Sequence, residues 1–163
     1  MDQDIIFEKY LLGTYRFLNF RLRSEKEIRD YLQKKKVSAD IIEKIIVRLQ
    51  EQKFLNDETF ARMWIESRSR SKPRSQFLLK RELQQKGISR EIIEKIMTND
   101  QLPMTNDYDL AKDVVQRKIK KYRGMERQEI YRKLGGLLAR RGFNWDVTKK
   151  AIDEILAIEA DSI

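Results

Sequence analysis

The sequence has 163 residues, of which 40% are hydrophobic and 37% are charged, and it contains no histidine and no cysteine. The absence of both residue types excludes thiolate and imidazole metal sites, a cysteine nucleophile and a histidine general base. A net charge of +9, from 35 Lys and Arg against 26 Asp and Glu, favours a polyanionic partner.

The sequence shows no sign of a membrane span or of export. No run approaches the roughly 18 consecutive apolar residues of a transmembrane helix. The start, Met1-Asp2-Gln3-Asp4, is acidic and unlike a signal peptide. The lack of cysteine fits a reducing compartment. We therefore expect a cytoplasmic protein with no membrane association and no cofactor.

The first predicted unit, residues 1–53, contains three helices. The first helix is predicted over Ile5–Phe20. The second begins at Ser24, which forms a capping box with Glu27. The third follows Ser38, a residue type that favours the N-cap position. Its apolar residues at positions 42, 45, 46 and 49 have the spacing of an amphipathic helix.

The second predicted unit, residues 54–103, repeats the first with a shift of 51 residues. Nine positions between residues 32 and 45 are identical to their shifted counterparts, without a gap. Its first helix is predicted over Asp57–Arg68, with Asn56 or Asp57 as the cap. Its second helix can open at Pro73, and its third follows Ser89. An internal repeat of this length is typical of stacked helical units.

The third predicted unit, residues 104–163, continues the pattern with a further shift of 55 residues. Arg141-Gly142-Phe143-Asn144 matches Lys86-Gly87-Ile88-Ser89. Its helices are predicted over Tyr108–Tyr122, over about 126–141, and after Asn144. The segments 53–56 and 98–107 are predicted joints between units.

These patterns predict an all-α protein, because alternating apolar and polar runs typical of strands are absent. Units this small cannot bury their apolar faces alone. We therefore expect three tandem three-helix repeats, stacked into an elongated, curved array of right or left hand. Lys36 occupies the position of Gly87 and Gly142, so it is expected to form a looser turn or to adopt a left-handed backbone.

Each unit has a net charge of +3, but the charge is uneven within it. Residues 21–36 hold seven basic and three acidic side chains, residues 68–86 hold seven and one, and residues 117–141 hold ten and two. The third helices begin with Asp40, Glu91 and Asp146, which phosphates would repel. A helix-turn-helix reader inserts the start of that helix into DNA, so sequence-specific readout is disfavoured.

The predicted binding surface therefore lies at the junctions between first and second helices. Lys44, Arg48, Lys149 and Lys150 fit an ordinary solvated surface instead. Trp145, just after a cap, is expected to be partly exposed, for local packing or for a partner. The predicted partner- and DNA-binding residues are Arg21, Arg23, Arg68, Arg70, Lys72, Arg74, Lys80, Arg81, Lys118, Lys120, Lys121, Arg140, Arg141 and Trp145.

Four segments, in this order, resemble the successive signatures of the RecX regulatory proteins. They are Arg21-Leu-Arg-Ser-Glu-Lys-Glu-Ile-Arg29, Phe54-Leu-Asn-Asp-Glu-Thr-Phe-Ala61, Glu82-Leu-Gln-Gln-Lys-Gly-Ile88 and Leu138-Ala-Arg-Arg-Gly-Phe143. The resemblance implies a bacterial cytoplasmic protein of stacked three-helix repeats, which lies in the groove of the RecA–DNA filament. It also implies negative modulation of the ATPase, recombinase and coprotease activities of RecA in DNA repair and the SOS response.

The resemblance supplies no catalytic residues, and some members of that family are longer at one or both ends. This chain therefore corresponds to a short form or to part of a longer protein. We expect a monomer.

Two other functions are alternatives. A nonspecific binder of single- and double-stranded DNA, with no recombinase partner, would show the same charge. Single-strand binders usually stack bases on aromatic side chains, but Phe60, Trp64 and Phe77 fall on apolar stripes and are predicted to be core. An enzyme is disfavoured, because no nucleophile, base and orienting group come together, and Gly135-Gly136 lacks the rest of a phosphate loop.

Overall fold

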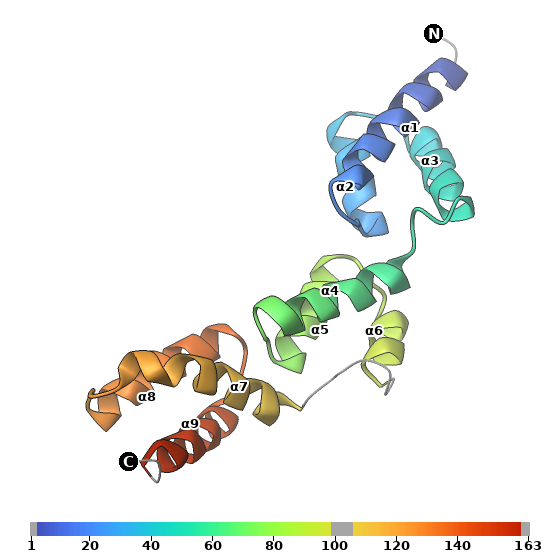
Figure 1. The fold of residues 1–163 in the computed structure, drawn as a ribbon. Helices are drawn as coiled ribbons and strands as arrows, with labels where there is room; N and C mark the ends of the chain where they lie inside the picture. The colour runs from blue at the N-terminus through green and yellow to red at the C-terminus, as the bar shows by residue number, and fades with distance from the viewer. Residues whose placement is uncertain (1–2, 99–105, 161–163) are drawn as a thin grey trace. The chain divides into compact units, whose positions relative to one another are not determined.

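The computed structural model describes residues 3–98 and 106–160. Within these ranges the chain forms nine α-helices, one short 3-10 helix and no strand (Figure 1). The all-α prediction is therefore confirmed. Most of the predicted joint 98–107 lies outside the described residues.

The first repeat consists of α1 (Gln3–Asn19), α2 (Glu25–Lys34) and α3 (Ala39–Glu51). Their apolar faces meet in one core that includes the fully buried Ile28 and Leu49. The four apolar positions predicted to form the inner face of α3 are all buried, because their spacing places them on the side that contacts α1 and α2.

The second repeat consists of α4 (Asp57–Ser71), α5 (Gln76–Gln85) and α6 (Arg90–Met97). The prediction that α5 opens at Pro73 is wrong. Ser75 caps α5 instead, since its Oγ accepts a hydrogen bond from the backbone N–H of Leu78 at 3.2 Å. A serine hydroxyl satisfies a free amide at a helix start, which proline cannot do.

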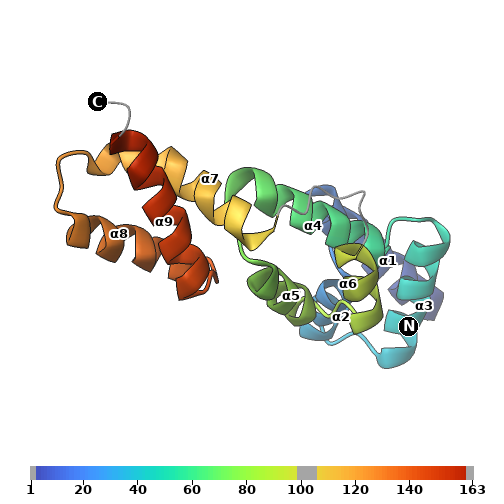
Figure 2. The ribbon, with the colours of Figure 1, turned by 90° about the horizontal axis from the view of Figure 1, so that it is seen from below.

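The third repeat consists of α7 (Asp107–Ile119), a 3-10 helix (Lys120–Tyr122), α8 (Arg127–Arg140) and α9 (Trp145–Ala160). Helix α9 packs against both α7 and α8 (Figures 1 and 2). These helices share a core around Leu134, Leu138 and Ile152, all fully buried.

The chain divides into two compact units, and the boundary passes through α4 and α5. One unit holds the described residues up to Trp64 and those from Leu83 to Thr98. The other holds Ile65–Glu82 and the described residues from Asn106 onward. The middle repeat therefore contributes to both units.

The predicted helix caps are mostly confirmed. Ser24 and Glu27 form the capping box. The N–H of Glu27 donates to Ser24 Oγ at 3.3 Å, and the N–H of Ser24 donates to Glu27 Oε2 at 3.2 Å. Ser89 and Asn144 accept from amides of their first turns at 3.3 and 2.8 Å. Ser38 is the exception, because its side chain makes no capping hydrogen bond.

The three turns that follow the second helices share one geometry. Lys36, Gly87 and Gly142 all have a positive φ, of 59°, 80° and 84°. In each turn the next residue donates its N–H to the carbonyl five residues earlier, at 3.0 to 3.2 Å. This is the left-handed end of a helix that glycine favours. The left-handed conformation expected for Lys36 is confirmed.

The first joint links the start of α2 to the second repeat. Ser24 Oγ donates to the carbonyl of Lys86 at 2.7 Å, and the N–H of Glu25 donates to Asp57 Oδ1 at 2.8 Å. The turn at Gly87 lies so close to α2 that a Cβ added there would come within 2.6 Å of the Lys26 Cβ.

The second joint repeats this arrangement at the start of α5. The N–H of Ser75 donates to the carbonyl of Arg141 at 3.0 Å, and the N–H of Gln76 donates to Asp107 Oδ1 at 2.8 Å. A Cβ on Gly142 would lie 2.5 Å from Ser75 Oγ. Asp57 and Asp107 therefore each accept a hydrogen bond from the first amide of the second helix in the preceding repeat. Asn56 and Asn106 cap the helices that those aspartates begin.

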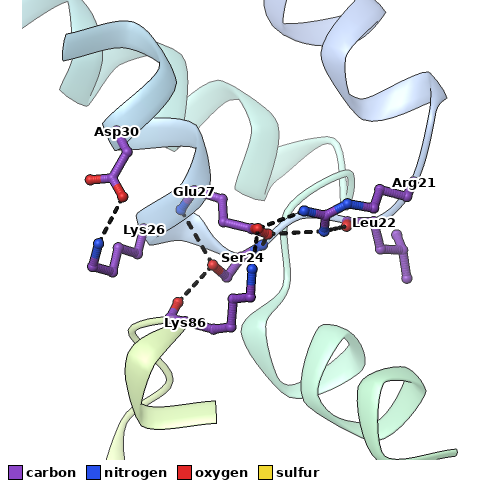
Figure 3. A network of polar contacts seen from close by, with 7 residues as sticks. All are labelled: Arg21, Leu22, Ser24, Lys26, Glu27, Asp30 and Lys86. Atoms are coloured by element: carbon purple, nitrogen blue, oxygen red, sulfur yellow. Dashed lines mark hydrogen bonds and ion pairs between the residues drawn. The ribbon is translucent and has the colours of Figure 1, made fainter. Parts of the chain in front are cut away.

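A network of ions holds the first joint together (Figure 3). Glu27, with a side chain 15% exposed, pairs with Arg21 and with Lys86, each at 2.7 Å. Burial alone would raise the pKa of Glu27, but hydrogen bonds from Arg21, Lys86 and the Ser24 amide lower it to about 2. Glu27 therefore stays ionised in the folded protein far below ordinary carboxyl pH values.

Replacing Lys36 by glycine should stabilise the protein by about 1 kcal/mol, since a left-handed backbone strains every side chain with a Cβ. The free energy of unfolding in urea measures the effect. Lys35→Gly is the control, because Lys35 has a φ of −85° and gains nothing from glycine. A Lys36→Gly variant no more stable than the parent protein would contradict the argument.

Gly142→Ala should destabilise the protein by about 3 kcal/mol, through backbone strain and the collision with Ser75. Gly124→Ala is the matched control, because Gly124 also has a φ of 80° but nothing lies within 4 Å of the added Cβ. It should cost about 1 kcal/mol. Equal losses in thermal and urea unfolding would show that the joint is not tightly seated.

Glu27→Gln should lower stability by about 2 kcal/mol near neutral pH. Because the folded-state pKa of Glu27 is depressed, its contribution is present above the ordinary carboxyl value of 4.5 and is lost as the pH falls toward 2. The difference from the parent protein should therefore shrink at low pH. Urea unfolding across this range measures it, with the exposed Glu51→Gln as charge control. A pH-independent difference would refute the network.

Candidate functional site

The candidate site consists of the basic residues at the junctions between first and second helices. In residues 3–98 and 106–160, no group of three or more acidic side chains is arranged to hold a metal ion. Within the same described ranges, no helix has the length and apolarity to cross a bilayer.

At the first junction, Arg21 and Arg23 lie on either side of Leu22. Arg21 pairs with Glu27, and the Arg23 guanidinium lies over the ring of Phe17 at 3.9 Å. Burial, and then the charge of Arg21, lower the pKa of Arg23. Its Nε is buried with no hydrogen-bond partner. Arg23 therefore serves packing as much as charge.

Phe17 is itself part of an aromatic stack. Its ring lies parallel to that of Tyr31, with centroids 4.4 Å apart and an interplanar angle of 8°. The Tyr31 hydroxyl donates to the carbonyl of Gly13 at 3.4 Å. A cation above such a stack is stabilised by the ring electrons and needs no carboxylate partner.

At the second junction, two arginines converge on one carboxylate. Arg68 Nε lies 3.4 Å from Glu82 Oε2, and Arg74 contacts the other oxygen. The Glu82 side chain is only 11% exposed. Burial lowers the pKa of Arg74, and the charges of Arg68 and Arg141 lower it further. Positive charge therefore exceeds negative charge at this position.

Arg141 brings a third guanidinium to the second junction. It is the C-cap residue directly after α8, and its carbonyl accepts a hydrogen bond from the N–H of Ser75, which follows Arg74 directly. Arg141 is half-buried, and burial followed by the charge of Arg117 lowers its pKa. Among the described residues, no carboxylate pairs with Arg141. We call Arg68, Arg74 and Arg141 the arginine cluster.

The repeat register explains the difference between the two junctions. Arg74 is the counterpart of Arg23, displaced by 51 residues. The same shift carries Phe17 onto Arg68, and Tyr31 onto Glu82. An aromatic stack in the first repeat is thus replaced by an ion pair in the second.

The start of α5 adds to the positive charge of the second junction. Helix α2 has Glu25 and Glu27 in its first turn, whereas α5 has no acidic residue there. The positive end of a helix dipole is normally offset by such residues. Only Asp107, from α7, accepts a hydrogen bond from the first amide of α5.

The prediction that Phe77 lies in the core is wrong. Phe77 is 68% exposed in the first turn of α5. Phe60 is buried as predicted, and Trp64 is half-buried. The helical period placed Phe77 near the apolar stripe, but Leu79 and Leu83 form the buried face of α5. Phe77 instead points an aromatic ring at solvent.

The remaining predicted cations are more scattered. Arg70 is exposed and pairs with Glu66. Among the described residues, no carboxylate forms an ion pair with the other members of this group. These members are Lys72, Lys80, Arg81, Lys120, Lys121 and Arg140, all exposed, and Lys118, which is half-buried.

Trp145 begins α9 and is 58% exposed, which confirms the predicted partial exposure. Its ring packs over Gly135 of α8, where an added Cβ would lie 3.3 Å from the indole. The Tyr131 ring lies 6.4 Å away at an angle of 52°. Local packing therefore holds one part of the ring, and the rest faces solvent.

Sequence reasoning missed two cations. Lys86 pairs with Glu27 and lies 5.1 Å from the Trp64 ring centroid. Arg117, which pairs with Asp113 at 2.8 Å, lies near Arg141. The repeat aligns Lys86 with Arg141, which was a predicted binding residue, so the alignment could have identified Lys86 as well.

Family models match most of the chain, in order. Residues 14–49 match the first three-helix domain of RecX, residues 56–97 the second, and residues 105–152 the third. The structure also resembles the crystal structure of RecX from Lactobacillus salivarius, with a TM-score of 0.69 and 22% identity, over 91% of this chain and 95% of that one.

Curated relatives named regulatory protein RecX are similar across the same region. The relative from Streptomyces lividans is 30% identical over 146 residues, which are 90% of this chain and 77% of that protein. The relative from Bacillus subtilis strain 168 is 32% identical over 85% of this chain, which spans about half of its length, 52%. With three consecutive domain matches and these relatives, the chain belongs to the RecX family of regulatory proteins.

Proposed function

We propose that this protein binds the RecA–DNA filament in the cytoplasm and lowers the ATPase, recombinase and coprotease activities of RecA. Its role would thus lie in homologous recombination, DNA repair and the SOS response. The ordered match to all three RecX domains is the observation that carries the proposal. The basic helix junctions support it, because the filament contains a polyanion.

The junctions offer two kinds of contact to such a partner. Arginines can pair with two oxygens of a carboxylate or phosphate at once, which gives geometric specificity as well as energy. The exposed Lys72, Lys80 and Arg81 would act as more diffuse charge, with affinity that falls steeply as salt rises. A monomer would suffice, since each repeat brings its own basic junction.

Inhibition requires more than binding. A ligand shifts an equilibrium only by the difference between its affinities for the two states. This protein must therefore bind the filament state with low ATP turnover more tightly than the active state. A protein that contacts both DNA and recombinase would do so if their relative placement differs between the two states.

The exposed Phe77 favours a second candidate function, a nucleic-acid binder with no recombinase partner. Aromatic rings beside cations are the usual platform for unpaired bases. Retention on bare DNA with no effect on recombinase would support this candidate.

Added to RecA on single-stranded DNA, the protein should lower the rate of ATP hydrolysis. Charge reversal of the exposed Arg70, Lys72, Lys80 and Arg81 should weaken that inhibition by about tenfold or more in half-inhibitory concentration, because four cations are lost. Arg68 and Arg74 are left intact, since a new carboxylate beside Glu82 would unfold the junction.

The matched control reverses Lys44, Arg48, Lys149 and Lys150, four exposed cations on third helices. It changes the net charge by the same amount and should leave the inhibition within about twofold of the parent. Equal loss in both variants would show that only total charge matters. Undiminished inhibition by the first variant would show that Arg70, Lys72, Lys80 and Arg81 take no part in the mechanism.

A further inference from the structure

We infer that the arginine cluster and the first turn of α5 form a seat for single-stranded nucleic acid, with Arg74 and Arg141 on a backbone phosphate and Phe77 on a base. The inference deepens the proposed function, because it names the ligand of one part of the basic surface. It assigns to this seat one set of DNA contacts within the basic surface.

The geometry brings Arg74 and Arg141 together before any ligand arrives. The hydrogen bond of 3.0 Å between Ser75 N–H and the Arg141 carbonyl ties the two backbones. The tight approach of Gly142 to Ser75 and Leu78 fixes that turn further. The charge of Arg141 acts on Arg74, and an anion bound between the two side chains would relieve their mutual repulsion.

The carboxylate of Glu82 does not neutralise the arginine cluster. Glu82 serves both Arg68 and Arg74, and no described carboxylate pairs with Arg141. The charge of Arg117, which is also positive, acts on Arg141 and lowers its pKa after burial does. A half-buried site with surplus positive charge loses less to water screening than an exposed one, so an added anion is bound more strongly.

The pair of arginines favours phosphate over carboxylate. At the start of α5 the amides of Gln76 and Leu78 already donate to Asp107 and Ser75, so the arginines and the helix dipole are what remains to attract an anion. A phosphodiester has oxygens in several directions, and it can accept from two arginines together. A planar carboxylate matches one arginine face.

The first junction shows what a neutralised version looks like. There Glu25 and Glu27 occupy the first turn of α2, and Glu27 pairs with Arg21 and Lys86. Lys86 occupies the position in its repeat that Arg141 occupies in the next repeat. Unlike Arg141, Lys86 forms an ion pair, with the carboxylate of Glu27. The two junctions share the left-handed glycine turn and the aspartate contact but differ in charge, so the first is an internal comparison for the second.

Phe77 selects a single strand over a duplex. It lies two residues after the Ser75 cap, 68% exposed, and its counterpart at the first junction is Lys26. An exposed ring can stack on an unpaired base, and bases within a duplex offer no such face. A base and its phosphate would therefore be held by residues only three positions apart, Arg74 and Phe77.

The experiment measures binding of a labelled single-stranded oligonucleotide by fluorescence anisotropy, with no recombinase present. The Arg74→Gln, Arg141→Gln double variant should bind about tenfold more weakly, and its plot of log affinity against log salt should be shallower by about 1 to 2. Lys44→Gln with Lys149→Gln removes the same charge from exposed positions on third helices and should bind within about twofold of the parent.

Phe77→Ala should weaken single-strand binding about tenfold and leave duplex binding unchanged. Equal losses in the two double variants, or unchanged binding by the Arg74→Gln, Arg141→Gln variant, would overturn the inference. If the double variant does not fold, Arg141→Gln alone decides, because it leaves Glu82 paired with Arg68 and Arg74. Without recombinase in the assay, this inference and the proposed inhibition of RecA can fail separately.

Discussion

The seating of a left-handed turn against the start of the preceding second helix is the contact on which the rest depends. It occurs twice, with Gly87 against Lys26 and with Gly142 against Ser75, and an aspartate that begins the following repeat completes each joint. The close approach leaves no room for a Cβ. Each repeat is small, and these joints supply the burial and hydrogen bonds that a three-helix unit lacks alone.

The same joints gather positive charge, and this links the fold to the proposed function. The residue before each cap is an arginine, and the residue before each glycine is a lysine or arginine, so seating the turn brings both cations together. One largely buried carboxylate, Glu27 or Glu82, offsets part of the repulsion. The first joint is neutralised further by its own helix start, and the second is not. Repetition followed by divergence has thus left two joints that are similar in backbone but differ in charge.

Much of this architecture follows from the sequence, because repetition exposes it. The internal register predicted the three-helix units, and the position shared by Lys36, Gly87 and Gly142 predicted the left-handed turn. The predicted start of α5 was wrong. Proline and serine both occur at helix starts, so only packing shows whether Pro73 or Ser75 precedes the helix. Phe77 was assigned to the core because periodicity does not show which of several adjacent apolar residues turns inward. The arginine cluster needed the fold, because Arg141 is far from Arg74 along the chain.

Hydrogen exchange of the backbone amides, with and without a RecA–DNA filament, tests the account most directly. The filament should slow exchange over residues 75–79 and 140–143, where the second joint meets its ligand, and should leave α3 and α6 unchanged. Slowed exchange confined to α3 and α6, with the second joint unaffected, would contradict the account.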